Sequence, residues 1–474
     1  MTGSSGDSQV RSGSRPILWT SGTGCDADRG ANLGQAGYSY AFVARQFARM
    51  LEADFDLRPV ADGDSSGSSS PGTIAGHLSF RPPQDVELLP GVKNVIVPAW
   101  EFPEIPRAPW MADPRDDWAR TANACDLILQ LCEFTRDAFV RGGVTAPMAV
   151  VPVPVSPDYF GVADWQADQV VTLKTPAIVV SGKAISPPAA TASSGSGSSK
   201  RTGVGWGIAS ARSVYHRCVR PWVPWWIERG LKAGLREARR QRRLSQGARA
   251  LHVDSVTLSG VVFTSLFNPL DRRKNWEDLI SAWILTLGQK SNATLVLKLV
   301  GNDPSGLDEV LFWLQSLDLG PGGRVVVLTG FLSEEQMIDL ARATTWYVTP
   351  TRAEGACLPL MQWLAAGRPA VATCHTAIQD YFSPAQGLVV ESHPEPCPWP
   401  HDPSQVLRTH WQRIVWSSLA QQLERAYRMV VEDPVRYRDM SHEARRVSRE
   451  RHHPDVVGPR LRKALWDVVG RPSI

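Results

Sequence analysis

The sequence of 474 residues has no apolar run long enough to cross a membrane. A membrane-spanning helix needs about 20 mostly apolar residues, and no window of this chain approaches that length without interruption. The first fifteen residues are rich in Ser and Gly and lack the apolar stretch of a secretory signal. We therefore expect a cytoplasmic protein.

Cysteine is sparse, and its paired motifs are missing. The seven cysteines are scattered, odd in number and without a C-x-x-C pair. This pattern argues against a disulfide framework and against a structural zinc site, and it fits a reducing compartment. The sequence also has no repeat of fixed period, which excludes solenoids and propellers.

Positive charge is concentrated in one segment. Residues 200–249 contain thirteen Lys and Arg and only two acidic residues, a net charge of +11, although the whole chain carries only +4. The rest of the chain is therefore acidic, at about −7 by subtraction. Because the positive charge is confined to this segment, the chain lacks the broad basic surface typical of nucleic-acid-binding proteins. We therefore expect no nucleic-acid partner.

The length and the apolar patterning predict two α/β domains. A chain of 474 residues exceeds what one hydrophobic core usually organises. A strand at 17–20, a Gly-rich stretch and a helix at about 38–51 begin a doubly wound pattern, and a second such pattern starts at 261. Helical patterns are expected from residue 407 onward. Further strands are expected at 94–98, 126–131, 149–155, 294–300, 324–328, 345–348 and 370–373.

These patterns give the following expected organisation. The first and the second domain should each have a Rossmann-like fold. A low-complexity, basic and Trp-rich insert should separate them. The expected boundaries are 1–14 (disordered), 15–184 (first domain), 185–260 (insert), 261–450 (second domain) and 451–474 (C-terminal helix).

The most informative loop runs from Pro350 to Gln362. A strand ends near Pro350, and Pro359 stands where the first turn of a helix would be. Free N–H groups of such a turn bind anions such as a diphosphate. Glu354 lies on the loop ahead of the helix, and Gln362 lies about one turn into the helix. Both side chains would face the crevice at this anion site. A capped helix with one incidental acidic residue explains the same pattern, and this alternative stays open.

A second segment places three cations, Arg272, Arg273 and Lys274, at the start of a helix. They follow the first strand of the second domain, where ligands bind in open α/β sheets. Fixed cations there would stabilise the negative charge that builds on a leaving diphosphate. A solvated run of charges is the alternative, but such a run rarely lies between Phe267-Asn268-Pro269 and Trp276.

Together these motifs resemble the retaining GT-B glycosyltransferases of the large family that contains sucrose synthase and many bacterial polysaccharide enzymes. Members carry E-G-x-G-L-P-x-x-E, and here the stretch reads Glu354-Gly355-Ala356-Cys357-Leu358-Pro359-Leu360-Met361-Gln362. The stretch Ala365-Ala366-Gly367-Arg368-Pro369-Ala370-Val371 that follows is also similar to the family. The resemblance covers residues 261–381 well and the first half more loosely. It implies a GT-B fold, in which two Rossmann-like domains face a central crevice, the first on the acceptor side and the second binding the nucleotide sugar.

The resemblance also implies residue roles. Glu354 would contact the transferred sugar, Gln362 would hold the ribose, and Arg273 and Lys274 would hold the diphosphate. The backbone of residues 355–358 (Gly355, Ala356, Cys357 and Leu358) would line the donor site. The family has glutamate where this chain has Gln362, which keeps an acceptor oxygen but loses the charge. Donor affinity or donor choice would change as a result.

Other candidates lie in the first half. Gly37 belongs to a segment similar to the family's Gly-rich loop, and a simple turn is the alternative. Glu101 follows a strand that faces the crevice and is a candidate for the acceptor or the reaction centre. Glu133 and Arg136 could contact substrate or form an ion pair at a helix start.

Two further motifs are interpreted as having no direct role in the reaction. His375 is interpreted as a satisfied loop histidine in preference to a donor contact. Asp26-Ala27-Asp28 resembles a metal motif of another transferase fold and is rejected because it precedes a GT-B-like helix. No metal and no cofactor are expected, since cationic side chains do that work in GT-B enzymes.

The expected activity is transfer of a sugar, with retention of configuration, from a nucleotide-diphosphate sugar to a glycan or lipid-linked acceptor in cell-surface polysaccharide assembly. Tryptophans and arginines at 217–243 suit an anionic inner-membrane surface, or else an interdomain packing element. The alternative function is a catalytically degenerate nucleotide-sugar-binding scaffold or partner subunit, motivated by Gln362. An epimerase or phosphorylase fits the motif poorly.

Overall fold

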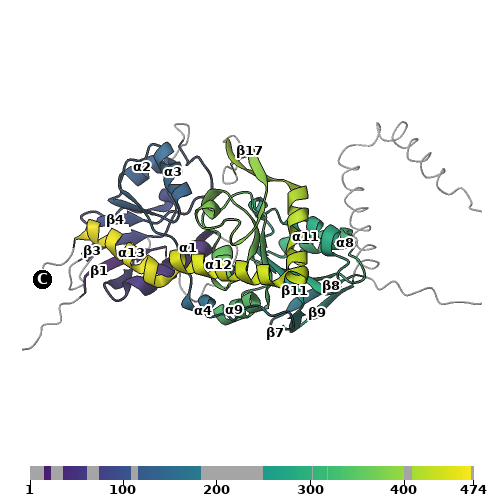
Figure 1. The fold of residues 1–474 in the computed structure, drawn as a ribbon. Helices are drawn as coiled ribbons and strands as arrows, with labels where there is room; N and C mark the ends of the chain where they lie inside the picture. Colours follow the sequence, from purple (N-terminus) through teal and green to yellow (C-terminus); the bar gives the residue numbers. More distant parts are fainter. Residues whose placement is uncertain are drawn as a thin grey trace, which may run out of the picture.

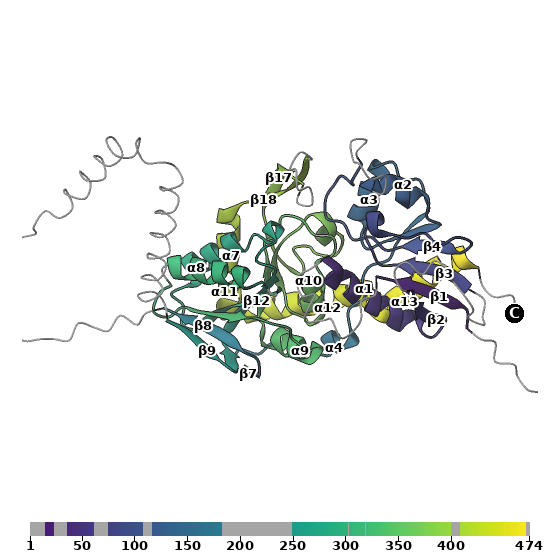
Figure 2. The same cartoon turned by 180° about the vertical axis from the view of Figure 1, so that it is seen from behind.

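The chain forms two α/β domains that lie side by side, as the computed structural model shows (Figures 1 and 2). The expected basic segment 217–243, the Asp26–Asp28 pair and Gly34-Gln35 fall outside the described residues. The described residues are 15–22, 36–60, 74–107, 116–182, 249–301, 303–317, 319–399 and 408–470.

The first sheet consists of six parallel strands in the order β2-β1-β3-β4-β5-β6. Alternate residues of one strand face opposite layers: Val95 belongs to the core cluster that contains Phe47 of α1, whereas Ile96 belongs to the cluster that contains Phe139 of α3. Because helices cover both faces, the central strands are largely buried, including polar residues such as His77 and Gln130. The elements are β1 (Ile17–Ser21), α1 (Ala36–Leu51), β2 (Asp56–Pro59), β3 (Ile74–Ser79), β4 (Lys93–Ile96), α2 (Trp118–Asn123), β5 (Leu127–Gln130), α3 (Glu133–Arg141) and β6 (Met148–Val150).

The second sheet has eight strands in the order β16-β15-β14-β11-β12-β13-β8-β9. The first six are parallel, and β8 and β9 run antiparallel at one edge. The expected α/β class is thus confirmed. The elements are β8 (Ala177–Ser181), β9 (Arg249–Val253), β11 (Val261–Phe267), α7 (Trp276–Leu287), β12 (Ala293–Leu299), α8 (Pro304–Ser316), β13 (Arg324–Leu328), α9 (Glu334–Ala343), β14 (Trp346–Thr349), α10 (Leu358–Ala365), β15 (Ala370–Thr373) and β16 (Gly387–Val390).

Strand pairing places residues 177–181 in the second sheet, and it pairs residues 170–173 with a strand just before β11 in a separate two-stranded sheet, although the sequence had suggested a first domain that runs to 184. Strand β8 pairs with β13, and β7 (Val170–Leu173) pairs with β10 (Val256–Ser259). Segment 183–248 therefore connects two neighbouring strands of one sheet, β8 and β9. The short helix α4 (Pro157–Phe160) lies on the chain between the two sheets.

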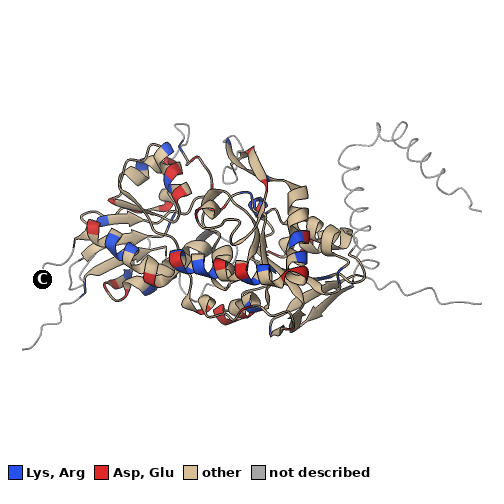
Figure 3. Cartoon of the chain, viewed as in Figure 1, with Lys and Arg blue, Asp and Glu red and all other residues tan. Residues whose placement is uncertain are grey.

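The C-terminal helices run from the second domain back to the first (Figures 1 and 2). Trp466 of the last helix stacks on Phe55 with ring centroids 4.4 Å apart, and Arg462 pairs with Asp54. The middle helix bridges the domains and carries charges of both signs along its length (Figure 3). These helices are α11 (Trp416–Glu432), α12 (Pro434–His452) and α13 (Pro454–Val469).

One segment differs from its expected structure. Helical patterns were expected from residue 407, but β18 (Arg408–Ile414) is a strand that pairs antiparallel with β17 (Ser392–Pro398). The paired strands satisfy each other's backbone groups, which overrides the local helical pattern. Among the described residues, no helix has the length and apolar character needed to cross a membrane.

Candidate active site between the two domains

The site is built from two loops that follow neighbouring parallel strands of the second sheet. Strand β11 leads into the turn η6 (Arg272–Lys274), and β14 leads into the loop before α10. Because parallel neighbours end at the same edge, the loops meet. The Arg352 N–H donates to the Arg273 carbonyl over 2.7 Å, and the Thr351 hydroxyl donates to the same oxygen over 3.0 Å.

Lys274 and Glu354 form a close ion pair across these loops. The Lys274 Nζ lies 2.6 Å from the Glu354 Oε1, and the side chains are only 21% and 6% exposed. Burial is the largest single influence and lowers the pKa of Lys274, but the Glu354 carboxylate, helped by Asp271, more than offsets it, so the pKa of Lys274 is raised overall. The lysine is therefore held as a fixed cation in a largely dry setting.

Arg273 reaches across the crevice to the first domain. Its Nη1 lies 2.9 Å from the Glu101 Oε1, and its Nη2 lies 2.7 Å from the Asp271 Oδ2. Burial opposes the charge, yet the carboxylates of Glu101, Asp271 and Glu354 together raise the pKa of Arg273. Four residues singled out in the sequence, Glu101, Arg273, Lys274 and Glu354, thus meet at one point, whereas Arg272 is exposed.

The turn from Gly355 to Leu358 presents the start of α10 to the first domain. A Cβ added at Gly355 would lie 3.0 Å from the Trp100 carbonyl oxygen, so any larger residue would force the two backbones slightly apart. Cys357 adopts a positive φ of 59°, and burial raises the pKa of its thiol to about 12. The Ala356 carbonyl accepts a hydrogen bond from the Tyr381 hydroxyl over 2.8 Å.

Two other sequence candidates lie less centrally. Gln362 is half-buried in the second turn of α10, and its side chain makes no hydrogen bond with any described residue. Gly37 lies within α1, which starts at Ala36, rather than in a loop ahead of a helix. Their roles toward a donor stay predictions.

The loop after β15 supports Glu354 from behind. The Glu354 N–H donates to the Thr376 hydroxyl over 3.1 Å, and the Ala377 N–H donates to the Glu354 carbonyl over 3.2 Å. Burial lowers the pKa of His375 to about 4, so its ring is neutral, and its Nε2 lies 3.0 Å from the Thr351 carbonyl oxygen. This contact fits the satisfied loop histidine that the sequence suggested. The support from Thr376 carried no recognisable motif.

The start of α3 faces the second domain. The Glu133 N–H donates to the Asp380 Oδ2 over 2.7 Å, which joins the domains. The side chains of Glu133 and Arg136 pair with each other near the solvent, as the ion-pair alternative described. The cysteine that caps α3, Cys132, donates weakly to the Gly355 carbonyl over 3.5 Å.

An aromatic cluster also bridges the two domains. Trp100 of the first domain contacts Trp399, just beyond β17, with ring centroids 5.3 Å apart. The Thr409 hydroxyl of β18 donates to the Glu104 carboxylate over 2.6 Å. Together with the Glu101–Arg273 pair, these contacts hold the two domains against each other beside the site.

No metal cluster is present within the described part of the chain. There, no three His, Cys, Asp or Glu side chains are grouped as ligands would be. The expected independence from metal ions stays a prediction, because it concerns the reaction.

Comparison with known proteins places this geometry in context. Residues 259–396 match the family model described as glycosyl transferases group 1. A search of curated proteins returned no match.

Three solved structures resemble the whole chain. Anabaena HepE in complex with UDP-glucose is 11% identical, with 95% of this chain and 99% of that chain covered and a TM-score of 0.51. A glycosyltransferase from Rickettsia africae ESF-5 is 10% identical, with 97% and 100% covered and a TM-score of 0.53. Sucrose-phosphate synthase from Thermosynechococcus elongatus is 13% identical, with 95% and 98% covered and a TM-score of 0.51.

Identities this low show the fold and no more. The likeness extends over both α/β domains of the chain. The chain therefore has the GT-B fold of glycosyltransferases, and its residues 259–396 match the group 1 family of these enzymes.

Proposed function

We propose that the chain is a glycosyltransferase that moves a sugar from a nucleotide-diphosphate sugar to an acceptor with retention of configuration. The observation that carries the proposal is the convergence of Arg273 and Lys274 with Glu354 and Glu101 at the crevice. Two cations beside a helix start suit a diphosphate, and two carboxylates suit sugar hydroxyls.

The ion pairs suggest how a donor would bind. Without a donor, Lys274 and Glu354 neutralise each other. A diphosphate would replace Glu354 as the partner of Lys274, and the freed carboxylate would then accept hydrogen bonds from the sugar. The same exchange would release Glu101 from Arg273 toward the acceptor side.

Catalysis would follow from positioning and charge. As the bond to the leaving diphosphate breaks, negative charge grows on its oxygens, and cations held in a dry site stabilise that charge most strongly. Glu101 and Glu354 would orient the acceptor and the sugar on the two walls. Neither residue needs to act as a covalent nucleophile.

The acceptor is proposed to be a glycan or a lipid-linked glycan in cell-surface polysaccharide assembly. The protein would work in the cytoplasm, at the membrane surface through residues 217–243. Co-sedimentation of wild type and a deletion of residues 200–249 with anionic liposomes tests the membrane contact, and equal binding would end that idea.

The central experiment is a thermal-shift panel of UDP-, GDP-, ADP- and TDP-sugars. UDP-glucose comes first because the Anabaena HepE structure holds it. We expect one donor to raise the melting temperature of wild type and to have no effect on Lys274→Ala. Arg272→Ala is the matched control, since this exposed neighbour should retain the shift.

The outcome separates the two candidate functions. Transfer or hydrolysis of the stabilising donor by wild type, with the anomeric configuration of the product read by NMR, supports the enzyme. Binding without either reaction favours the degenerate scaffold that Gln362 motivates, and Gln362→Glu should then restore turnover. A shift that survives in Lys274→Ala would contradict the proposed donor site.

A further inference from the structure

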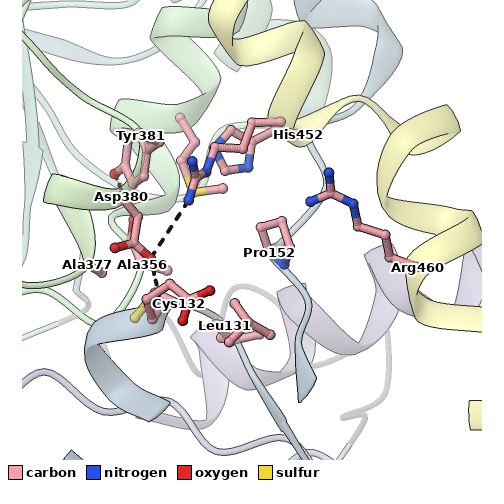
Figure 4. A pocket seen from close by; sticks show the side chains of 13 residues that line it. Leu131, Cys132, Pro152, Ala356, Ala377, Asp380, Tyr381, His452 and Arg460 are labelled. Carbon is pink, nitrogen blue, oxygen red and sulfur yellow. Dashed lines mark hydrogen bonds and ion pairs between the residues drawn. The ribbon is translucent and has the colours of Figure 1, made fainter. Parts of the chain in front are cut away.

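A cavity lies beside the candidate active site, where the two domains and the C-terminal helices meet (Figure 4). Cys132 and Pro152 line it from the first domain, and Ala356 and Asp380 line it from the second. Arg460 of α13 closes the remaining side. Ala356 lies two residues from Glu354, so the cavity borders the proposed reaction centre.

The size of the cavity limits its occupant. Its volume is about 80 Å³. Pockets for whole small molecules measure roughly 300–1,000 Å³, and one water molecule occupies about 30 Å³ of liquid. The cavity therefore admits one small group, such as a phosphoryl group, and excludes a nucleotide sugar.

The hydrogen-bond donors that lack full partners in this cavity belong to two arginine side chains. Arg460 is exposed to solvent at the mouth of the cavity and points toward it from the side opposite Asp380 (Figure 4), and it forms no ion pair with any residue that the structure describes. Arg451 lies 4.0 Å from Asp380, at the limit of an ion pair. The carboxylates are better satisfied, because Asp380 accepts the Glu133 N–H and Glu133 pairs with Arg136.

His452 adds a buried acceptor to the cavity wall. Its side chain is 2% exposed, and burial lowers its pKa to about 3, so the ring is neutral. Its Nδ1 lies 3.2 Å from the Val153 carbonyl oxygen and must carry the proton. Its Nε2 has no partner among the described residues. A ligand that satisfies both His452 and the arginines carries a hydroxyl donor and an anionic oxygen.

We propose that this cavity binds the phosphate of the acceptor, which is therefore a phosphorylated polyol. The proposal rests on the proposed transferase function and names the acceptor class for it. Planar guanidinium groups match phosphate oxygens in pairs, which suits Arg451 and Arg460. Arg460 belongs to α13 on the first domain, whereas Arg451 lies beside the second domain, so a bound phosphate would hold the domains together around the donor.

The test measures binding of glycerol 3-phosphate, the simplest such compound, to the full chain by calorimetry. Glycerol and inorganic phosphate at equal ionic strength are the comparison ligands. We expect wild type to bind glycerol 3-phosphate more tightly than either. Arg460→Gln should lose at least about tenfold in affinity, because it removes a charged hydrogen-bond donor to the phosphate. Lys463→Gln is the control, because this exposed lysine of the same helix pairs with Asp467.

Three results would overturn the proposal. Wild type fails to bind glycerol 3-phosphate, Arg460→Gln binds it as well as wild type, or inorganic phosphate binds equally tightly, which indicates a free-anion site. Binding of the nucleotide sugar, measured on the same samples, separates this failure from failure of the proposed function. Arg460→Gln should retain the donor shift that Lys274→Ala loses.

Discussion

The pair of Lys274 and Glu354 allows a quantitative test of how the free protein holds its candidate site. The perturbation is Lys274→Met, which keeps the side-chain stem and removes the charge. The Glu354 carboxylate, only 6% exposed, would lose the partner that lies 2.6 Å away. It would then lie, without that partner, in a place that water reaches poorly.

The expected loss of stability follows from the burial of the pair. Removing one partner of a fully buried pair costs about 3–5 kcal/mol. Lys274 is 21% exposed and Arg273 stays close to Glu354, so we expect a loss of about 2 kcal/mol. Glu354→Gln should cost about 1 kcal/mol, because the amide oxygen still accepts from the lysine.

The assay is a double-mutant cycle by urea denaturation of wild type, both single variants and the double variant. Circular dichroism and tryptophan fluorescence should be recorded together, since two domains need not unfold in one step. We expect the double variant to be more stable than the sum of the singles implies, by about 1–2 kcal/mol. Strict additivity of the two single losses would refute the reasoning, because the pair would then contribute nothing.

Two further predictions concern pH and packing. Burial lowers the pKa of His375 to about 4, below its ordinary 6.5, so between these values the unfolded chain binds a proton that the folded protein does not. Stability should therefore fall as the pH drops through this window, by up to about 1.4 kcal/mol per unit, and urea midpoints at several pH values should show a smaller fall in His375→Gln. Gly355→Ala places a Cβ against the backbone of Trp100 and should cost about 1–3 kcal/mol, read as a lower melting temperature. Gly161→Ala, whose Cβ would meet only an ordinary 3.5 Å contact, should change it little, and equal effects of the two variants would argue against the close approach.

Much of the fold could be predicted because its strands are buried on both faces. The strands at Arg324–Leu328 and Ala370–Thr373 have the bounds that their short apolar runs predict. The meeting of Lys274 with Glu354 was likewise foreseeable, since both follow strands that the fold makes neighbours. The sequence was therefore enough to predict strand bounds, and also contacts between loops that follow neighbouring strands of a known fold.

Features that depend on distant segments could not be predicted. The predicted first domain, residues 15–184, includes strand β8. Only the pairing of β8 with β13 assigns it to the second sheet. The cavity joins Cys132 to Arg451 and Arg460, which lie about 300 residues away, and no spacing rule connects them. The strand at Arg408–Ile414 forms because it pairs with β17. The helix that its local pattern predicted was therefore wrong.

The return of α13 to the first domain has a consequence for biosynthesis. One face of the first sheet is covered partly by α1, available early, and partly by α13, which is translated only after the whole second domain. Until residues 454–469 leave the ribosome, apolar surface around Phe55 stays open to the surrounding medium. The second domain can therefore fold before the first is complete, and the nascent first domain is the natural client for a chaperone.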